Sequence, residues 1–282
     1  MITVNNLSFQ FGGQLLFKDV DLKFTPGNCY GIIGANGAGK STLMKVFCGI
    51  HKRDEGEIVL YGKPVNFSNI KESQDAGISM IHQELNMMNH LTVAQNIYIG
   101  REPMKGGFID DKKMEKDAAE LFKRIGVKID PSVTLGTLTV GKQQMVEIAK
   151  ALSRNSRIIL MDEPSATLTK KELDALFQII RDLKEQGIAV IYISHRMEEI
   201  FELCDRITVL RDGEYVGTEN IAEIDLEHVV QMMIGREIGE RYPKRDVTIG
   251  EEVLRVEGLS HEKMFKDVNF SVRAGEVLGV SG

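Results

Sequence analysis

One short segment combines glycines with a lysine and two hydroxyl side chains. It consists of Gly34, Ala35, Asn36, Gly37, Ala38, Gly39, Lys40, Ser41 and Thr42, and it fits the pattern Gly-x-x-x-x-Gly-Lys-Ser/Thr. Glycines are needed in such a loop because successive backbone N–H groups turn inward around phosphate oxygens, in conformations that a side chain would block. Lys40 is then expected to reach the β- and γ-phosphates, and Ser41 to offer its hydroxyl to Mg²⁺. The segment is predicted to bind the phosphates of a nucleoside triphosphate.

The residues on either side of this loop have the apolar patterns of a strand and a helix. Residues 30–33 form an apolar run before the loop. After Ser41, apolar residues recur at the spacing of one buried helical face, at Leu43, Val46, Phe47 and Ile50. The positive end of this helix would point at the bound anion. The alternative is a glycine-rich turn without a ligand, and both the flanking pattern and the Lys-Ser pair argue against it.

Polar side chains follow three further apolar runs that are predicted to be strands. The runs cover residues 77–81, 157–161 and 189–193, and the polar residues after them are Gln83, Asp162, Glu163 and His195. In open α/β sheets, ligands bind beyond the carboxyl ends of the strands. These side chains are therefore candidates for one site with the phosphate-binding loop.

The chemistry of these residue types suggests a role for each. Asp162 is suited to the shell of a metal ion, and Glu163 to accepting a proton from an attacking water. The neutral amide of Gln83 suits Mg²⁺ or a water. Each residue also has an ordinary interpretation. Gln83 fits a solvated loop glutamine, and Asp162 with Glu163 fits a capped strand end before a proline turn. His195 fits a histidine that packs in the core or caps a helix.

Two other segments are weaker candidates. Phe11 lies in a Phe-Gly-Gly sequence, where a flat aromatic ring could stack on a purine base, although an ordinary core aromatic fits equally well. Thr139 and Gly141 lie at the start of a predicted helix. Small residues at that position favour either anion binding or a simple helix cap.

Composition and charge narrow the class of protein. The chain has 282 residues, a formal net charge of -6 at pH 7 and an isoelectric point near 5.6. A nucleic-acid partner is not expected, because neutralising phosphates requires a concentrated basic face. The cysteines Cys29, Cys48 and Cys204 stand in apolar surroundings and are predicted to be buried thiols of a reducing compartment. No apolar run approaches the roughly 18–20 residues that a transmembrane helix needs.

The order of the patterns predicts an α/β fold with three parts. Residues 2–7 and 20–24 are expected to form an antiparallel β subdomain. The fully apolar runs indicate a mostly parallel core sheet that is covered on both faces. A helical subdomain is expected at about residues 92–152, where apolar residues recur at helical spacing among many charges. Together these parts form one domain over residues 1–234.

An internal repeat follows a segment without periodicity, residues 235–250, which is predicted to be a linker. The repeated pairs are residues 4–8 with 256–260 and residues 17–20 with 265–268. Residues 251–282 are therefore expected to be the first strands of a second domain of the same kind, cut from a longer tandem protein.

Five motifs together resemble the nucleotide-binding domain of an ATP-binding cassette (ABC) ATPase, over essentially residues 1–234. They are the phosphate-binding loop, Gln83, and residues 138–144, 159–164 and 193–195. The resemblance implies a phosphate-loop NTPase fold, with ATP and Mg²⁺ as cofactors. It implies that Phe11 stacks on adenine, that Gln83 senses the γ-phosphate and that Asp162 supports the metal. It also implies that Glu163 polarises the attacking water and that His195 orients the γ-phosphate.

Two departures from the usual pattern identify a subgroup. The family signature Leu-Ser-Gly-Gly-Gln reads Leu-Thr-Val-Gly-Lys at residues 138–142, and the loop after Glu163 ends in Thr169 instead of aspartate. With the repeat, these features resemble the ATPases of bacterial monosaccharide importers of the ribose, galactose and xylose type. That resemblance implies transmembrane permease subunits as partners and, through them, a periplasmic or extracellular sugar-binding protein. It also implies a peripheral location on the cytoplasmic face of the inner membrane.

In ABC proteins each ATP lies between the phosphate-binding loop of one domain and the signature loop of another. In this subgroup the second copy's phosphate-binding loop commonly lacks its lysine. We therefore expect the competent site to combine Lys40, Glu163 and His195 with the second domain's signature loop, while Thr139 and Gly141 serve a weaker site. The alternative is a soluble tandem ABC ATPase that acts on the ribosome. Such proteins carry Glu-Pro-Thr-Asn-His-Leu-Asp after the catalytic carboxylate and a long charged linker, and this sequence has neither.

Overall fold

The computed structural model describes residues 1–12, 14–235, 247–262 and 264–280. The chain divides into two units, Met1–Glu237 and Ile238–Gly282. The first unit holds every candidate site residue.

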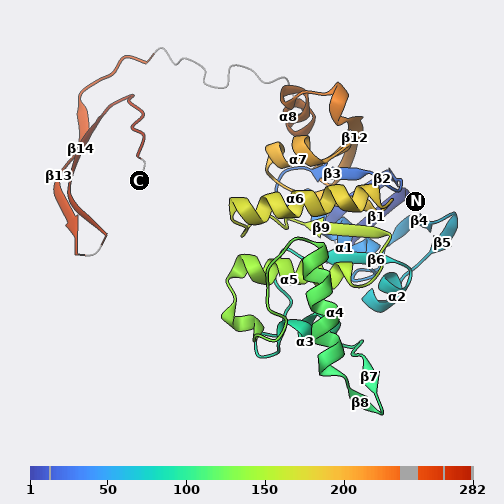
Figure 1. Ribbon diagram of the computed structural model, residues 1–282. Coiled ribbons are helices and arrows are strands. Elements are labelled where there is room, and N and C mark those ends of the chain that lie inside the picture. The colour runs from blue at the N-terminus through green and yellow to red at the C-terminus, as the bar shows by residue number, and fades with distance from the viewer. Residues whose placement is uncertain (13, 236–246, 263, 281–282) are drawn as a thin grey trace. The chain divides into compact units, whose positions relative to one another are not determined.

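The centre of the first unit is a parallel sheet (Figure 1). Its strands, in spatial order, are β6 (Ile78–Ile81), β9 (Ile158–Asp162), β10 (Ala189–Ile193), β3 (Cys29–Ile33) and β11 (Arg206–Arg211). Every residue of β3, β9 and β10 is buried, because both faces of the sheet are covered. The predicted mostly parallel core sheet is confirmed.

Antiparallel strands extend this sheet beyond β11 to a total of ten strands among the described residues. They are, in spatial order, β12 (Glu214–Asn220), β2 (Gln14–Phe24), β1 (Ile2–Phe11), β4 (Glu55–Leu60) and β5 (Lys63–Val65). A single parallel bridge, Glu214 with Lys18, connects β12 to β2. The ladder between β1 and β2 runs beyond the predicted strand ends and pairs Phe9 with Phe17. The predicted antiparallel β subdomain is therefore present, with longer strands.

Side chains of alternate residues in β3 enter two different hydrophobic clusters. Tyr30 and Ile32 pack in the cluster that contains α1 (Lys40–Phe47), whereas Cys29 and Ile33 pack in the other cluster. Helices that contribute to this other cluster include α6 (Lys170–Glu185), α7 (Met197–Leu203) and α8 (Leu226–Ile234). The expected buried helical face ends early, because Gly49 has φ +70° just after α1. Ile50 is consequently exposed rather than buried.

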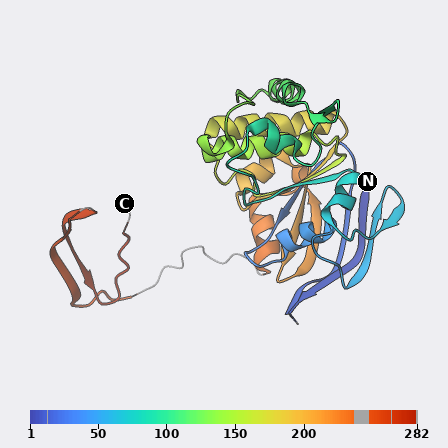
Figure 2. The ribbon, with the colours of Figure 1, turned by 90° about the horizontal axis from the view of Figure 1, so that it is seen from below.

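The predicted helical subdomain is also present, and its helices lie side by side (Figures 1 and 2). These are α3 (Val93–Tyr98), α4 (Asp111–Arg124) and α5 (Val140–Leu152). The sequence patterns did not predict the short hairpin of β7 (Met104–Lys105) and β8 (Phe108–Ile109), the helix α2 (Ile70–Asp75), or the 3₁₀ turns at Leu135–Thr137 and Ile221–Glu223. Among the described residues, no helix combines the length and apolar character of a membrane span.

The second unit contains a hairpin of β13 (Glu252–His261) and β14 (Phe265–Arg273). Its register repeats that of β1 and β2: the pairs Val4–Leu22, Leu7–Val20 and Phe9–Phe17 correspond to Val256–Phe270, Leu259–Val268 and His261–Phe265. A local hydrogen bond is repeated too, since the backbone N–H of Asp19 donates to Ser8 Oγ and that of Asp267 donates to Ser260 Oγ. The sequence repeat is thus a structural repeat. Most of the predicted linker, residues 236–246, lies outside the described residues, and the domain boundaries remain a prediction.

Candidate functional site

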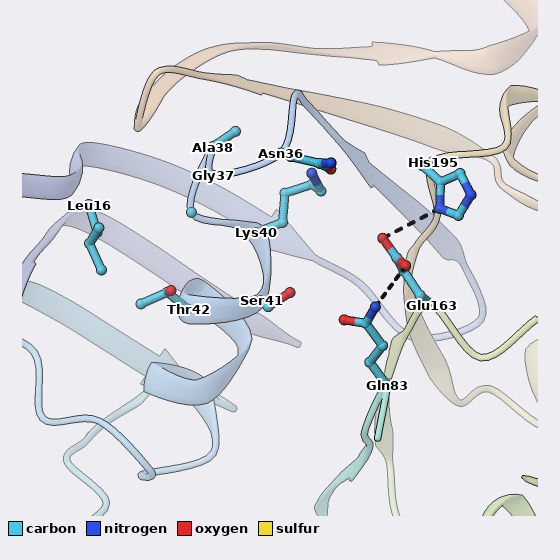
Figure 3. A pocket seen from close by; sticks show the side chains of 11 residues that line it. Leu16, Asn36, Gly37, Ala38, Lys40, Ser41, Thr42, Gln83, Glu163 and His195 are labelled. Carbon is cyan, nitrogen blue, oxygen red and sulfur yellow. Dashed lines mark hydrogen bonds and ion pairs between the residues drawn. The ribbon is translucent and has the colours of Figure 1, made fainter. Parts of the chain in front are cut away.

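A cavity of about 620 Å³ opens at the carboxyl ends of the parallel strands, beside the phosphate-binding loop. Figure 3 shows the side chains that line it. They are Leu16, Asn36, Gly37, Ala38, Gly39, Lys40, Ser41, Thr42, Gln83, Glu163 and His195. The structure therefore brings the phosphate-binding loop together with residues that follow β6, β9 and β10, as the sequence predicted.

The backbone of the phosphate-binding loop requires glycine at two positions. Gly37 and Gly39 have φ values of +83° and +88°, in the left-handed region. A Cβ atom on Gly39 would also lie 2.8 Å from the carbonyl oxygen of Leu16. Gly39 caps α1, so the backbone turns sharply into the helix at Lys40. The N-terminal end of α1 thereby borders the cavity.

Lys40 is a buried cation whose present partners are carbonyl oxygens of its own loop. Lys40 is only 8% exposed. Its Nζ donates to the carbonyl oxygens of Gly34 and Ala35 at 2.7 and 3.0 Å. Burial lowers the pKa of Lys40, and the carboxylates of Glu163 and Asp162 oppose that shift. Lys40 is thus held beside the cavity without a direct ion pair to either carboxylate.

Ser41 and Asp162 form a pair of oxygen ligands at the start of α1 and the end of β9. Ser41 Oγ donates to Asp162 Oδ1 at 3.1 Å. Asp162 is buried, and burial raises the pKa of its carboxyl, against the hydrogen bond from Ser41. Hydroxyl and carboxylate oxygens are the ligands that Mg²⁺ prefers, so this pair suits a magnesium ion bound with phosphates.

Glu163 joins two other candidate residues, as Figure 3 shows. Its carboxylate accepts a hydrogen bond from Gln83 Nε2 at 3.1 Å and lies 3.5 Å from Nδ1 of His195. The backbone of Glu163 is left-handed, with φ 47°, and its N–H donates to the carbonyl oxygen of Ile193 at 3.0 Å. A non-glycine residue in this conformation is strained, and such strain is concentrated at functional sites.

Three predicted site residues lie elsewhere. Phe11 is 67% exposed, lies near His51 with 6.2 Å between ring centroids, and does not line the cavity. Thr139 caps α5 by accepting a hydrogen bond from the backbone of Lys142. Gly141 lies against Glu172, whose Oε2 would be 2.5 Å from a Cβ atom at that position. The assignments of Phe11, Thr139 and Gly141 to nucleotide binding therefore stay predictions.

Leu16 lines the cavity but was not predicted to do so. It is an aliphatic residue in β2, and nothing in its type or spacing distinguishes it from an ordinary strand residue. Its carbonyl oxygen approaches Gly39 only because β2 lies beside the phosphate-binding loop in the folded unit.

Relatives of known description match the whole chain. It is 54% identical to the ribose import ATP-binding protein RbsA of Geobacillus kaustophilus and covers 58% of that protein. It is 45% identical to the galactose/methyl galactoside import ATP-binding protein MglA of Fusobacterium nucleatum and covers 57% of it. The chain thus spans somewhat more than half the length of these relatives.

Solved structures share the fold of the first unit. A nucleotide-free ATP-binding cassette from an ABC transporter aligns with 85% of this chain and 99% of its own, with a TM-score of 0.72 and 26% identity. A cassette in a post-hydrolysis state bound to ADP and Pi aligns with 78% of this chain and 99% of its own, with a TM-score of 0.67 and 25% identity. A family model described as ABC transporter matches residues 17–166, which include the phosphate-binding loop and Glu163. The motifs, the cavity and these matches agree that this chain belongs to the ABC transporter family.

Proposed function

We propose that this chain binds and hydrolyses ATP to energise the import of a monosaccharide through a membrane permease. One observation carries the proposal: Lys40 and Ser41 line the same cavity as Glu163, with Gln83 and His195 beside that carboxylate. The relatives are ribose and galactose/methyl galactoside import ATP-binding proteins, which supports a sugar as the cargo. They favour import over the alternative of action on the ribosome.

The proposed chemistry is phosphoryl transfer to water. Lys40 neutralises charge on the β- and γ-phosphates, and Glu163 orients the water and accepts its proton. Gln83 and His195, which flank Glu163, contact the γ-phosphate region. Ser41, Asp162 and Gln83 would hold Mg²⁺, which when bound neutralises phosphate charge. Most of the rate then comes from positioning and charge stabilisation.

The proposed site is completed by a second ABC domain of a longer tandem protein. Two observations support this: the hairpin of β13 and β14 repeats the register of β1 and β2, and the chain covers only 58% and 57% of the length of the two relatives. The second domain's signature loop would close the competent site over Lys40 and Glu163. Thr139 and Gly141, outside the present cavity, would serve the weaker site, and Phe11 would stack on adenine.

The proposed partners are permease subunits and, through them, a periplasmic or extracellular sugar-binding protein, with no nucleic acid involved. In this arrangement the protein works peripherally at the cytoplasmic face of the inner membrane. The residues that bind ATP do not determine which sugar is carried, because the binding protein and the permease select it.

Sugar uptake by the full-length tandem protein, reconstituted with its permease and binding protein, tests the proposal. Lys40→Ala should abolish uptake of ribose or galactose, because the competent site loses its phosphate-binding cation. Lys52→Ala is the matched control, since Lys52 is exposed and does not line the cavity. Uptake that survives the loss of Lys40 would contradict the asymmetric assignment. ATP turnover without any sugar uptake would contradict the import function.

A further inference from the structure

Glu199 is a buried carboxylate that has no part in the chemistry above. It lies in the first turn of α7 and is 4% exposed. Its Oε2 accepts hydrogen bonds from three hydroxyl groups: Ser165 at 2.8 Å, Tyr192 at 2.9 Å and Ser194 at 2.8 Å. One carboxylate oxygen of α7 thus contacts two other segments: the loop after β9, through Ser165, and β10 with the residue that follows it, through Tyr192 and Ser194.

Two of these segments carry the groups that face the γ-phosphate region. Ser165 lies two residues after Glu163, and Ser194 directly precedes His195. The turn after β10 is fixed further, because Ser194 Oγ accepts the backbone N–H of Arg196 at 3.0 Å. Glu199 is therefore hydrogen-bonded to side chains in the two segments that carry Glu163 and His195.

The charge of Glu199 strengthens this connection. Hydroxyl groups donate more strongly to an ionised carboxylate than to a neutral acceptor. The guanidinium of Arg196, 3.4 Å from Oε1, supplies partial charge compensation. Burial, and after it the negative charge of Glu199, raise the pKa of Tyr192, so this hydroxyl stays protonated and remains a donor. An amide at this position would offer one oxygen and present N–H groups where Glu199 has an acceptor.

We propose that Glu199 is a positioning residue that fixes the separation between Glu163 and His195 during ATP hydrolysis. It acts through Ser165 and Ser194. The strained backbone of Glu163, with φ 47°, needs such surrounding restraints, because a conformation of this kind persists only where neighbouring structure determines it. The inference rests on the proposed function, since the separation matters only if these two groups act on one phosphate.

Kinetics of the full-length protein test the proposal with the variants Glu199→Gln and Glu199→Ala. The expected result is a fall in kcat of about 10- to 100-fold, since misplacing a catalytic group by about 1 Å has an effect of that size. KM for MgATP should stay within about twofold, because the contacts of Lys40 and Ser41 do not involve Glu199. Glu198→Gln is the matched control, on the exposed side of the same helical turn. An unchanged kcat in Glu199→Gln, or equal effects of the Glu198 and Glu199 variants, would overturn the proposal.

A double-mutant comparison separates positioning from a general loss of stability. Ser165→Ala should lower kcat when Glu199 is present and have little further effect in the Glu199→Gln background, because the two residues act through one bond. Fully additive effects would contradict the proposal.

The imidazole resonance of His195, followed by NMR in the nucleotide-free protein, gives a readout that needs no turnover. It should shift in Glu199→Gln and not in Glu198→Gln. If the full-length protein does not hydrolyse ATP but the His195 resonance shifts in Glu199→Gln, the proposed function is contradicted and the positioning role of Glu199 is still supported. Absence of the shift would overturn the positioning role.

Discussion

Gly34, the first residue of the phosphate-binding loop, is in close contact with the parallel sheet. A Cβ atom on Gly34 would come closer than 3.0 Å to the carbonyl oxygen of Leu210. Leu210 is fully buried in β11, which is hydrogen-bonded to β3 on one side and to β12 on the other. β11 therefore cannot move away from Gly34 without breaking the hydrogen bonds to one of these neighbouring strands. The variant Gly34→Ala is therefore expected to destabilise the first unit.

The size of this effect follows from the kind of contact. Backbone φ at Gly34 lies outside the left-handed region, so the cost comes from overpacking alone, at about 3 kcal/mol of unfolding free energy. Gly37→Ala is the matched control in the same loop. Gly37 has φ +83° but no atom within 4 Å of an added Cβ, so only backbone strain of about 1 kcal/mol is expected.

Urea unfolding of the nucleotide-free chain measures both variants. Near-UV circular dichroism of the buried tyrosines Tyr30 and Tyr192 reports on the first unit. The midpoint should shift at an unchanged slope, and by more for Gly34→Ala than for Gly37→Ala. Equal losses in the two variants would contradict this prediction, because the contact of Gly34→Ala with Leu210 would then cost no more than the backbone strain of Gly37→Ala.

Two further predictions concern charged side chains. Lys40→Ala should weaken MgATP binding by about 100-fold or more, measured by calorimetry, since charge-assisted hydrogen bonds contribute about 1.5–3 kcal/mol each; binding within a few-fold of wild type would contradict the role of Lys40. Burial raises the pKa of Glu147 to about 7, against a backbone hydrogen bond from His82. The folded state therefore binds this proton more tightly than the unfolded state, and between about pH 4.5 and pH 7 rising pH should cost up to about 3 kcal/mol of stability. Glu147→Gln should remove this dependence of stability on pH. If wild type and variant lose the same stability over this pH range, Glu147 is not its source.

The gathering of the candidate residues at one edge of the sheet was predictable from the sequence, because the motifs that carry them are local. Glycines at fixed spacing determine the phosphate-binding loop, and apolar runs that end in Gln83, Glu163 or His195 locate three strand ends. Parallel pairing then brings those ends to one edge of the sheet, as the ladders between β6, β9, β10 and β3 show. The fold class followed from the same patterns.

Features that depend on strand order were not predictable. Cys29 and Cys204 are buried, as expected of the cysteines, but their Sγ atoms lie 3.5 Å apart across 175 residues of sequence. The hydrogen bond from Ser165 to Glu199 likewise joins residues that are 34 positions apart in the sequence. Helical spacing predicted that the buried face of the first helix reaches Ile50. The periodicity of apolar residues does not reveal the left-handed conformation of Gly49, which follows α1.

MgATP binding and turnover by the full-length protein, with and without Glu163→Gln, test directly whether this cavity is the site of ATP hydrolysis. The carboxylate of Glu163 faces the cavity, and the glutamine variant keeps its size but removes the proton acceptor. We expect the variant to bind MgATP as tightly as wild type and to hydrolyse it at least about 100-fold more slowly. Turnover by Glu163→Gln at the wild-type rate would contradict the assignment of this cavity as the site of hydrolysis.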